Sequence, residues 1–243
     1  MCLAVAALST RAAAADPPKR IISLTPALTE IVFAIGAGDR LVGVSSFCDY
    51  PPEARTIEAV GTFVNPAVER IVAKRPDLIL AEPNVGNRNS VESLRRMGLE
   101  VAILDPDTLA QAKAAFVTIA TRLGVAARGR DLVAKVEHEI ERTVETLGDA
   151  PLRSTLFVVS RKPLIVAGTG TLQDELIALG RGRNVGAIGG EGWPHLSLER
   201  VIAAAPDVII DASMGSDADV NEARNFWQRF ASLPAVRDGG VTA

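Results

Sequence analysis

Few side chains in this sequence could hold a metal ion. Of the two histidines, His138 falls among charged residues at helical spacing, and His195 stands in the loop sequence Trp-Pro-His. His195 could contact a metal carried by a ligand, and Tyr50, the single tyrosine, could be an axial ligand to heme iron. Cys48 is interpreted as a small buried thiol. We therefore expect neither a resident metal site nor a bound cofactor.

A glycine-rich segment raises the possibility of an enzyme. Residues 168–173, Gly-Thr-Gly-Thr-Leu-Gln, follow an apolar stretch and open a predicted helix, as in a dinucleotide-binding turn. The third glycine of that pattern is absent, Gln173 standing in its place, and a turn that needs permissive residues explains the segment better. No Ser-His-Asp or Cys-His order emerges either. A nucleotide-dependent enzyme stays an alternative, and a protein without catalysis is the prediction.

Three aromatic residues fall outside the periodic apolar stripes. The chain has one tyrosine, two tryptophans and seven phenylalanines, and Tyr50, Phe63 and Trp193 stand in predicted loops. Loops at the ends of strands commonly carry binding residues, and aromatic faces suit a flat, largely apolar macrocycle. We predict that these three residues contact such a ligand. The alternative is that each covers the core of its own lobe.

A duplicated segment gives the architecture. Residues 68–80, Val-Glu-Arg-Ile-Val-Ala-Lys-Arg-Pro-Asp-Leu-Ile-Leu, recur as residues 198–210, Leu-Glu-Arg-Val-Ile-Ala-Ala-Ala-Pro-Asp-Val-Ile-Ile. In each copy a helix is stopped by proline, at Pro76 or Pro206, and an aliphatic strand follows. Two such copies predict two similar α/β lobes, and the cleft between two lobes is a common place for a small ligand.

The repeat also places one carboxylate on each lobe. Glu69 and Glu199 occupy the same position in the first turn of the duplicated helix. Acidic side chains there interact favourably with the helix dipole, which is a sufficient explanation. Two matching carboxylates could also meet two matching basic sites on a symmetric partner.

The remaining pattern predicts a parallel sheet in each lobe, because strands alternate with helices. The lobes span residues 20–124 and 152–243, and a linking helix spans 126–148. From Ala126 to Leu147 this helix would be about 33 Å long at ~1.5 Å per residue. A helical strut of that kind permits less movement between lobes than paired flexible strands do. Outside the repeat we expect strands at 20–24, 41–44, 101–104, 155–160 and 164–166, and helices at 27–35, 90–97, 109–123, 172–179 and 221–230.

Composition and the two ends narrow the class of protein. With 26 basic and 29 acidic residues the net charge is −3, and no run of like charge indicates nucleic-acid binding. Residues 3–8 are apolar, and Ala-Ala-Ala at 13–15 follows, so residues 1–15 look like part of a signal peptide. The duplication also predicts a further strand and helix after Val241. An interaction module without a small ligand is disfavoured by the signal-like start.

Several motifs carry a family resemblance. They are Arg-Ile-Ile-Ser-Leu-Thr-Pro-Ala-Leu-Thr-Glu at 20–30, Gly-Val-Ser-Ser-Phe-Cys-Asp-Tyr-Pro-Pro-Glu-Ala at 43–54, the duplicated Glu-Arg and Pro-Asp pairs, and Gly-Trp-Pro-His-Leu-Ser-Leu-Glu at 192–199. Together they resemble the periplasmic cobalamin-binding proteins of ABC importers. That superfamily also contains heme- and siderophore-binding proteins. The resemblance implies two Rossmann-like lobes joined by a long helix, the class III fold of periplasmic binding proteins.

The resemblance further implies a function and the residues that perform it. A monomer in the periplasm would capture a corrinoid between its lobes, with Tyr50, Phe63 and Trp193 against the corrin and His195 nearby, and deliver it to an ABC permease dimer with its ATPase subunits. Glu69 and Glu199 stand where relatives carry the glutamates that dock to permease arginines. The chain has Phe63 where relatives can carry Trp, and Glu82 near another aromatic position. Heme or a ferric siderophore stays the alternative ligand.

Overall fold

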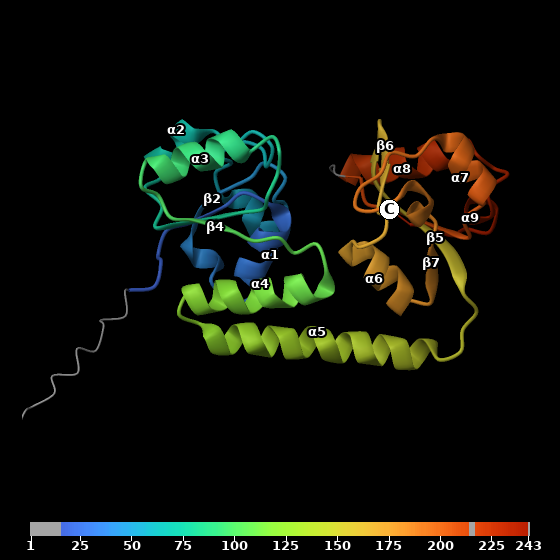
Figure 1. Cartoon of the computed structure of the whole chain (residues 1–243), viewed down its shortest axis with the longest axis horizontal. Coiled ribbons are helices and arrows are strands. Elements are labelled where there is room, and N and C mark those ends of the chain that lie inside the picture. The colour runs from blue at the N-terminus through green and yellow to red at the C-terminus, as the bar shows by residue number, and fades with distance from the viewer. Residues whose placement is uncertain (1–15, 214–216, 243) are drawn as a thin grey trace, which may run out of the picture.

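The N-terminal lobe is built on a four-stranded parallel sheet. The computed structural model describes residues 16–213 and 217–242, and its two lobes lie side by side above one long helix (Figure 1). The sheet has the order β2-β1-β3-β4. Its elements are β1 Ile21–Ser23, α1 Pro26–Ala34, η1 Gly38–Arg40, β2 Leu41–Val44, η2 Pro52–Thr56, α2 Val68–Ala73, β3 Leu78–Ala81, α3 Arg88–Arg96, β4 Val101–Ile103 and α4 Leu109–Arg122.

Helices cover both faces of this sheet, as its apolar strands require. Leu78 and Leu80 of β3 belong to the core that includes residues of α1 and α4, whereas Ile79 and Ala81 belong to the core with residues of α2 and α3. All four side chains are fully buried. The alternation of a strand therefore divides one short segment between two cores.

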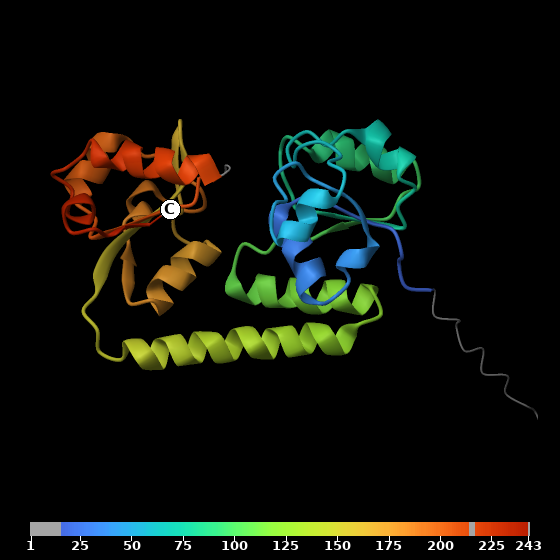
Figure 2. The same cartoon turned by 180° about the vertical axis from the view of Figure 1, so that it is seen from behind.

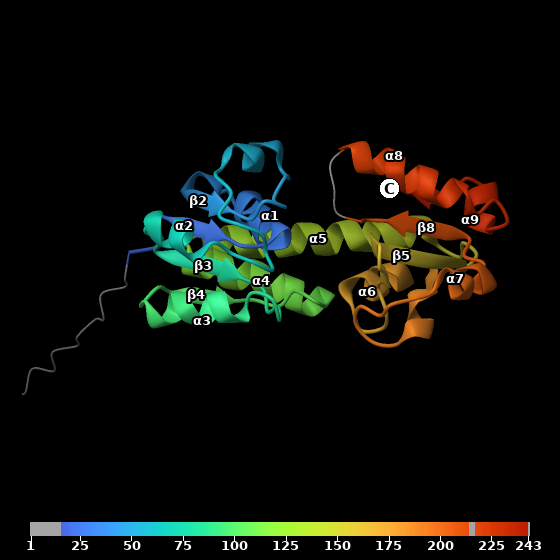
Figure 3. The ribbon, with the colours of Figure 1, turned by 90° about the horizontal axis from the view of Figure 1, so that it is seen from above.

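The C-terminal lobe repeats the order of the first sheet and adds one strand. Its strands β7, β5, β8 and β9 lie in parallel, in the places that β2, β1, β3 and β4 occupy in the first lobe. Figure 3 shows the two sheets from above. The elements are β5 Arg153–Arg161, β6 Leu164–Val166, α6 Leu172–Leu179, β7 Gly182–Asn184, η3 Gly186–Gly189, α7 Leu198–Ala204, β8 Val208–Asp211, α8 Asp217–Gln228, α9 Pro234–Arg237 and β9 Val241–Thr242.

The added strand corrects the expectation of two purely parallel sheets. β6 pairs with β5 in the antiparallel sense, so the second sheet is mixed. Only Lys162 and Pro163 separate the two strands, and so short a connection can join only antiparallel neighbours. The strand at 164–166 was expected, but its direction was not.

The Pro-Asp pair of the repeat fastens neighbouring strands at their beginning. Oδ2 of Asp77 accepts hydrogen bonds from the backbone N–H groups of Lys19 and Arg20, at 2.8 and 2.9 Å. Oδ2 of Asp207 accepts from the backbone N–H and the hydroxyl of Ser154, both at 2.8 Å. The carboxylate of Asp77 thus ties the start of β3 to the start of β1. The carboxylate of Asp207 ties the start of β8 to the start of β5 in the same way.

The residue before each proline turns the chain in the same way. Arg75 and Ala205 both have φ +46°, in the left-handed region that few residues other than glycine adopt. The following proline disfavours the right-handed helical conformation at these positions. The sequence therefore predicted the end of each helix, and the structure resolves the turn as a left-handed residue.

The linking helix α5, Ala126–Leu147, runs beneath both lobes, as the view from behind also shows (Figure 2). It is held to the N-terminal lobe. Nη1 of Arg128 donates to the backbone oxygen of Gly36 at 2.9 Å, and Lys113 forms an ion pair with Glu137 at 2.8 Å. A Cβ at Gly129 would meet Cβ of Ala120 at 2.5 Å, so α4 and α5 approach as closely as this glycine permits.

The α/β fold with two sheets and a long helix is confirmed. The helix at 126–147, the strands at 41–44 and 164–166, and the helix at 172–179 have the expected bounds, and a strand follows Pro76 as expected. The duplicated helix of the first lobe begins at Val68, the first residue of the repeat, and ends at Ala73 before Pro76. The expected signal segment, residues 1–15, lies outside the described residues, and the boundaries of the lobes stay a prediction.

We expect Asp207→Ala to lower the free energy of unfolding by about 1–2 kcal/mol at pH 7. The carboxylate accepts two hydrogen bonds from Ser154, and the Ser154 hydroxyl accepts a third from the backbone N–H of Asp207. Hydrogen bonds from Ser154 lower the pKa of Asp207. Its contribution is therefore complete above the ordinary pKa near 4 and is lost as the pH falls through the depressed value. Urea unfolding from pH 7 down to pH 2.5 would measure this.

The control for this experiment is Asp149→Ala, which removes an exposed carboxylate just after α5. A loss of stability at Asp207 that stayed constant down to the lowest pH would show that the carboxylate is not the group that matters.

Candidate functional site

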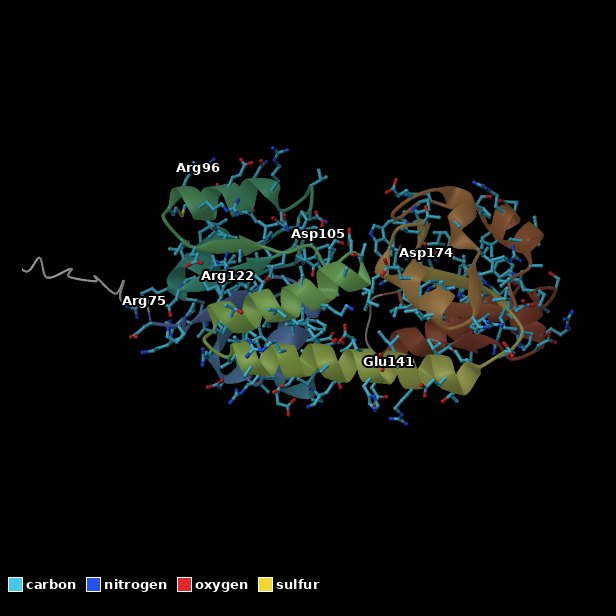
Figure 4. All side chains as sticks on the ribbon, turned by 60° about the horizontal axis from the view of Figure 1, so that its bottom comes forward. Arg75, Arg96, Asp105, Arg122, Glu141 and Asp174 are labelled. Atoms are coloured by element: carbon cyan, nitrogen blue, oxygen red, sulfur yellow. The ribbon has the colours of Figure 1, made fainter. Side chains whose placement is uncertain are left out.

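A cavity of about 420 Å³ lies between the lobes, above α5. Its walls come from α1, α4 and α5 on one side and from α6 and the loop before α7 on the other. Figure 4 shows Asp105 and Asp174 on facing sides of this region. The lining residues are Ala27, Glu30, Ile31, Ala34, Glu82, Pro106, Asp107, Ala112, Phe116, Leu132, Leu172, Gln173 and Trp193.

The N-terminal wall of the cavity is acidic. Glu82 follows β3, and its Oε1 accepts a hydrogen bond from the hydroxyl of Thr25 at 2.8 Å. Burial, followed by the charges of Asp107 and Asp105, raises the pKa of Glu82. Burial and the neighbouring Asp105 also raise the pKa of Asp107. These carboxylates share the carboxyl edge of the sheet, where polar residues after parallel strands converge.

A third carboxylate completes this wall and links it to the loop after β2. Burial raises the pKa of Glu30 on α1, and the charge of Asp49 raises it further. The hydroxyl of Thr29 on α1 donates to Sγ of Cys48 at 3.1 Å, so the loop that carries Tyr50 packs against the helix of Glu30. The Tyr50 side chain itself is 64% exposed and does not line the cavity.

The C-terminal wall is formed by Trp193 and the first turn of α6. Trp193 is 41% exposed, so part of its ring is open to solvent. Gln173 places Oε1 where water does not reach it, and this oxygen has no hydrogen-bond partner.

The backbone of Gly168 comes so close to that of Gly190 that a Cβ on Gly168 would lie 2.1 Å from the backbone oxygen of Gly190. Thr171 caps α6, so packing and capping explain the glycine pattern.

Phe63 lies in a loop that is tied to the acidic wall. Its ring meets that of Phe47 edge-on, with centroids 5.7 Å apart. Its backbone oxygen accepts from Nδ2 of buried Asn87, which also donates to the backbone oxygen of Glu82. Asn87 therefore holds the loops of Phe63 and Glu82 together. Phe63 does not line the cavity.

His195 follows Trp193 in the same loop but is not among the residues that line the cavity. Its backbone pairs with Ile165 of β6, and its side chain is exposed. His138 is exposed on α5. In residues 16–213 and 217–242 no group of three acidic, histidine or cysteine side chains could hold a metal ion. No helix within the same residues is long and apolar enough to cross a membrane.

Glu69 and Glu199 are exposed in the first turns of α2 and α7. The hydroxyl of Ser197 and a backbone N–H lower the pKa of Glu199, as in a helix cap. The arginine that follows each glutamate makes a hydrogen bond within its own lobe. Arg70 donates to the backbone oxygen of Ala59, and Arg200 donates to that of Ile188. The arginines of the repeat thus anchor each helix, and the glutamates face solvent.

A second cavity of about 480 Å³ continues from the first along α4, α5 and α6. It is mostly apolar, with Leu176 of α6 and Val144 of α5 both exposed. Above it, Oε2 of Glu175 on α6 accepts a hydrogen bond from the backbone N–H of Leu109 at 2.7 Å. This bond joins the C-terminal lobe to the first residue of α4.

The first cavity, between the lobes, is lined by residues that the sequence did not single out as binding residues. Glu30, Asp107 and Gln173 line it, and Glu82 was noted only as a departure from an aromatic position. Asp107 follows a strand, and this could have drawn attention to it. Glu30 and Gln173 lie within helices, and only their packing reveals which way they face.

A family model described as periplasmic binding protein matches residues 21–242. A vitamin B12-binding protein of Yersinia pseudotuberculosis is 31% identical over 237 residues, which are 96% of this chain and 82% of that protein.

Two solved structures show the range of ligands among the relatives. The periplasmic vitamin B12-binding protein of Vibrio cholerae has a TM-score of 0.77 at 28% identity and covers 93% of this chain and 87% of its own. A periplasmic heme-binding protein of Roseiflexus sp. RS-1 in its apo form has a TM-score of 0.80 at 30% identity and covers 93% and 88%.

The acidic wall predicts a dependence of stability on pH. Because the pKa of Glu82 is raised in the folded state, its charged form destabilises the fold above that pKa. We expect Glu82→Gln to raise the free energy of unfolding without ligand by on the order of 1 kcal/mol at pH 8, or about 2–4 °C in Tm. The gain disappears below pH 4, where the glutamate is neutral in both states.

The matched variant is Glu141→Gln on the exposed face of α5. It should change neither the free energy of unfolding nor the Tm. Thermal unfolding of both variants at pH 4 and pH 8 makes the comparison. An equal gain for Glu82→Gln at both pH values would assign its effect to packing and not to charge.

Proposed function

The chain belongs to the periplasmic binding protein family, and we propose that it captures a corrinoid between its lobes and delivers it to an ABC permease. Members of this family are periplasmic transport components without catalysis. The step to be explained is therefore selective binding and release.

The observation that carries the corrinoid proposal is the inter-lobe cavity with Trp193 on one wall and the Tyr50 loop beside the other. A cavity of this size accommodates one edge of a corrin ring, and the rest of the ring would extend over the exposed faces of both aromatic residues. Buried aromatic area supplies affinity, and polar groups fix orientation. The vitamin B12-binding relatives support this choice of ligand.

Heme is the second candidate, because a heme-binding protein is as similar in structure as a vitamin B12-binding one. Heme carries two propionates, and the cavity presents Glu30, Glu82 and Asp107. Neither histidine lines the cavity. Tyr50 stays the available axial ligand, and spectroscopy decides the matter.

We also propose that Glu69 and Glu199 dock the protein to the permease. α2 and α7 lie at the outer parts of their lobes, away from α5 (Figures 1 and 3). One turn after each glutamate stands an exposed aliphatic residue, Val72 at 40% and Ile202 at 41%. Residues three apart share a helix face. The duplication therefore offers two matched surfaces that suit a twofold-symmetric partner.

Titration of the purified protein with cyanocobalamin and with hemin tests the proposed ligand. We expect saturable binding of cyanocobalamin by calorimetry and no shifted Soret band with hemin.

Trp193→Ala and Tyr50→Ala should each weaken cyanocobalamin binding by about 1–3 kcal/mol, because each removes one aromatic contact. The Tm of each variant without ligand should barely change. Saturable hemin binding without a cobalamin signal would reject the corrinoid.

Docking is tested with the double variant Glu69→Arg, Glu199→Arg. We expect unchanged affinity for cyanocobalamin and at least tenfold weaker binding to the permease in lipid discs, with the loss reduced at high salt. The control is Glu141→Arg with Glu145→Arg, which makes the same change in net charge on exposed α5. Equal docking by both double variants would leave Glu69 and Glu199 with helix capping alone.

A further inference from the structure

One hydrogen bond crosses from the C-terminal lobe to the N-terminal lobe beside the inter-lobe cavity. Oε2 of Glu175 on α6 accepts it from the backbone N–H of Leu109, the first residue of α4, at 2.7 Å. In two opposite views the end of α4 that begins at Leu109 lies beside α6 (Figures 1 and 2). Within residues 16–213 and 217–242 it is the one hydrogen bond that joins the two lobes directly.

The N–H group that Glu175 binds is one that α4 cannot satisfy by itself. The first N–H groups of a helix have no partner within the helix. The hydroxyl of Thr108 accepts from the backbone N–H of Gln111 at 3.2 Å, and this cap leaves the N–H of Leu109 to other acceptors. The first turn of α4 contains no acidic residue. The carboxylate that the positive end of this helix favours is therefore supplied by the other lobe.

Glu175 is not needed at the start of its own helix, because its neighbour already serves there. Oδ2 of Asp174 accepts from the backbone N–H of Gly170 at 3.2 Å, and Oδ1 accepts from Nδ2 of Asn184 at 2.9 Å. The hydroxyl of Thr171 accepts from the backbone N–H of Asp174 and caps α6. The first turn of α6 thus has its own carboxylate and hydroxyl, and Glu175 serves the relation between the lobes.

The apolar side chains near this hydrogen bond line a cavity instead of filling it. Leu109 and Phe116 of α4, with Leu172 and Leu176 of α6, are among the walls of the cavity of about 480 Å³. The Leu176 side chain is 43% exposed. Little further apolar surface is uncovered when α4 and α6 separate, so apolar burial opposes this separation only weakly. The hydrogen bond from Leu109 to Glu175 therefore supplies much of the resistance to opening.

From these contacts we infer that Glu175 is a positioning residue that latches the two walls of the inter-lobe cavity and sets the rate at which a ligand enters and leaves. This inference rests on the proposed function and concerns the regulation of the same site. α4 and α6 both line the cavity, with Phe116 and Gln173 among their residues. When the latch opens, water replaces Glu175 at the N–H of Leu109, and each lobe stays folded on its own core. One opening equilibrium then controls exchange in both directions.

Hydrogen exchange of single backbone amides, followed by NMR without ligand, measures the latch directly. We expect the N–H of Leu109 to be protected about tenfold or more relative to an unstructured peptide, although the first residue of a helix ordinarily exchanges freely. Glu175→Ala should remove this protection, and Glu175→Gln, which keeps an acceptor oxygen, should restore most of it. The N–H of Ala112 donates to the backbone oxygen of Thr108 at 2.8 Å and should stay protected in every variant.

Stopped-flow mixing with cyanocobalamin measures the consequence for the ligand. Glu175→Ala should raise the association and dissociation rate constants together, each about 5- to 20-fold, and change Kd by less than about threefold. Loss of an ordinary contact with the ligand instead raises mainly the dissociation rate constant. Both rate constants of Glu175→Gln should lie within about threefold of those of the unaltered protein. The control Glu141→Ala on the exposed face of α5 should leave both unchanged.

The two measurements separate the latch from the function on which it rests. An unprotected Leu109 in the unaltered protein, or unchanged protection in folded Glu175→Ala, overturns the latch and leaves corrinoid capture intact. A rise in the dissociation rate constant alone also overturns it, because Glu175 would then act as a ligand contact. If cyanocobalamin does not bind, the proposed function fails, and the hydrogen exchange of Leu109 by itself decides for or against the latch.

Discussion

The relation between the two lobes depends on how α5 and α6 are held to the N-terminal lobe. Arg128 and the close packing at Gly129 fix α5 to α1 and α4. In the part of the chain that the structure describes, the hydrogen bond from Leu109 to Glu175 is the one polar side-chain contact that passes directly between the lobes. It places a carboxylate at the start of α4, where the helix dipole favours negative charge. The distance between the two walls of the cavity therefore depends on the packing of α5 against α4 and on the hydrogen bond from Leu109 to Glu175.

The duplication explains most of what stabilises each lobe. Both sheets use an aspartate after proline to fasten two strands, and both use a left-handed residue to leave the helix. The lobes differ where they face each other. The first supplies carboxylates at the ends of its strands, and the second supplies an aromatic ring and an amide on a helix. Shared features maintain the fold, and the differences between the lobes give the cavity its chemistry.

The sequence predicted the architecture well because its signals are local. Apolar strands, helical spacing and the prolines of the repeat fixed most elements to within a residue or two. The antiparallel direction of β6 was missed because it depends on the short connection at Lys162 and Pro163 and not on the apolar pattern of the strand. The polar lining was missed for another reason. Gln173 lies among ordinary helix residues, and the burial of its Oε1 without a hydrogen-bond partner is visible only in the folded structure.

The anchoring of α5 at one end makes it a lever. Its tight contact with α4 lies near its first turns, at Gly129, while its far end supports the C-terminal lobe. Over a helix about 33 Å long, a tilt of about 5° at the anchor displaces the other end by roughly 3 Å. That is the length of a hydrogen bond. Because Leu132 of α5 lines the inter-lobe cavity less than one turn after Gly129, the close packing at this glycine bears directly on how far apart the two lobes stand.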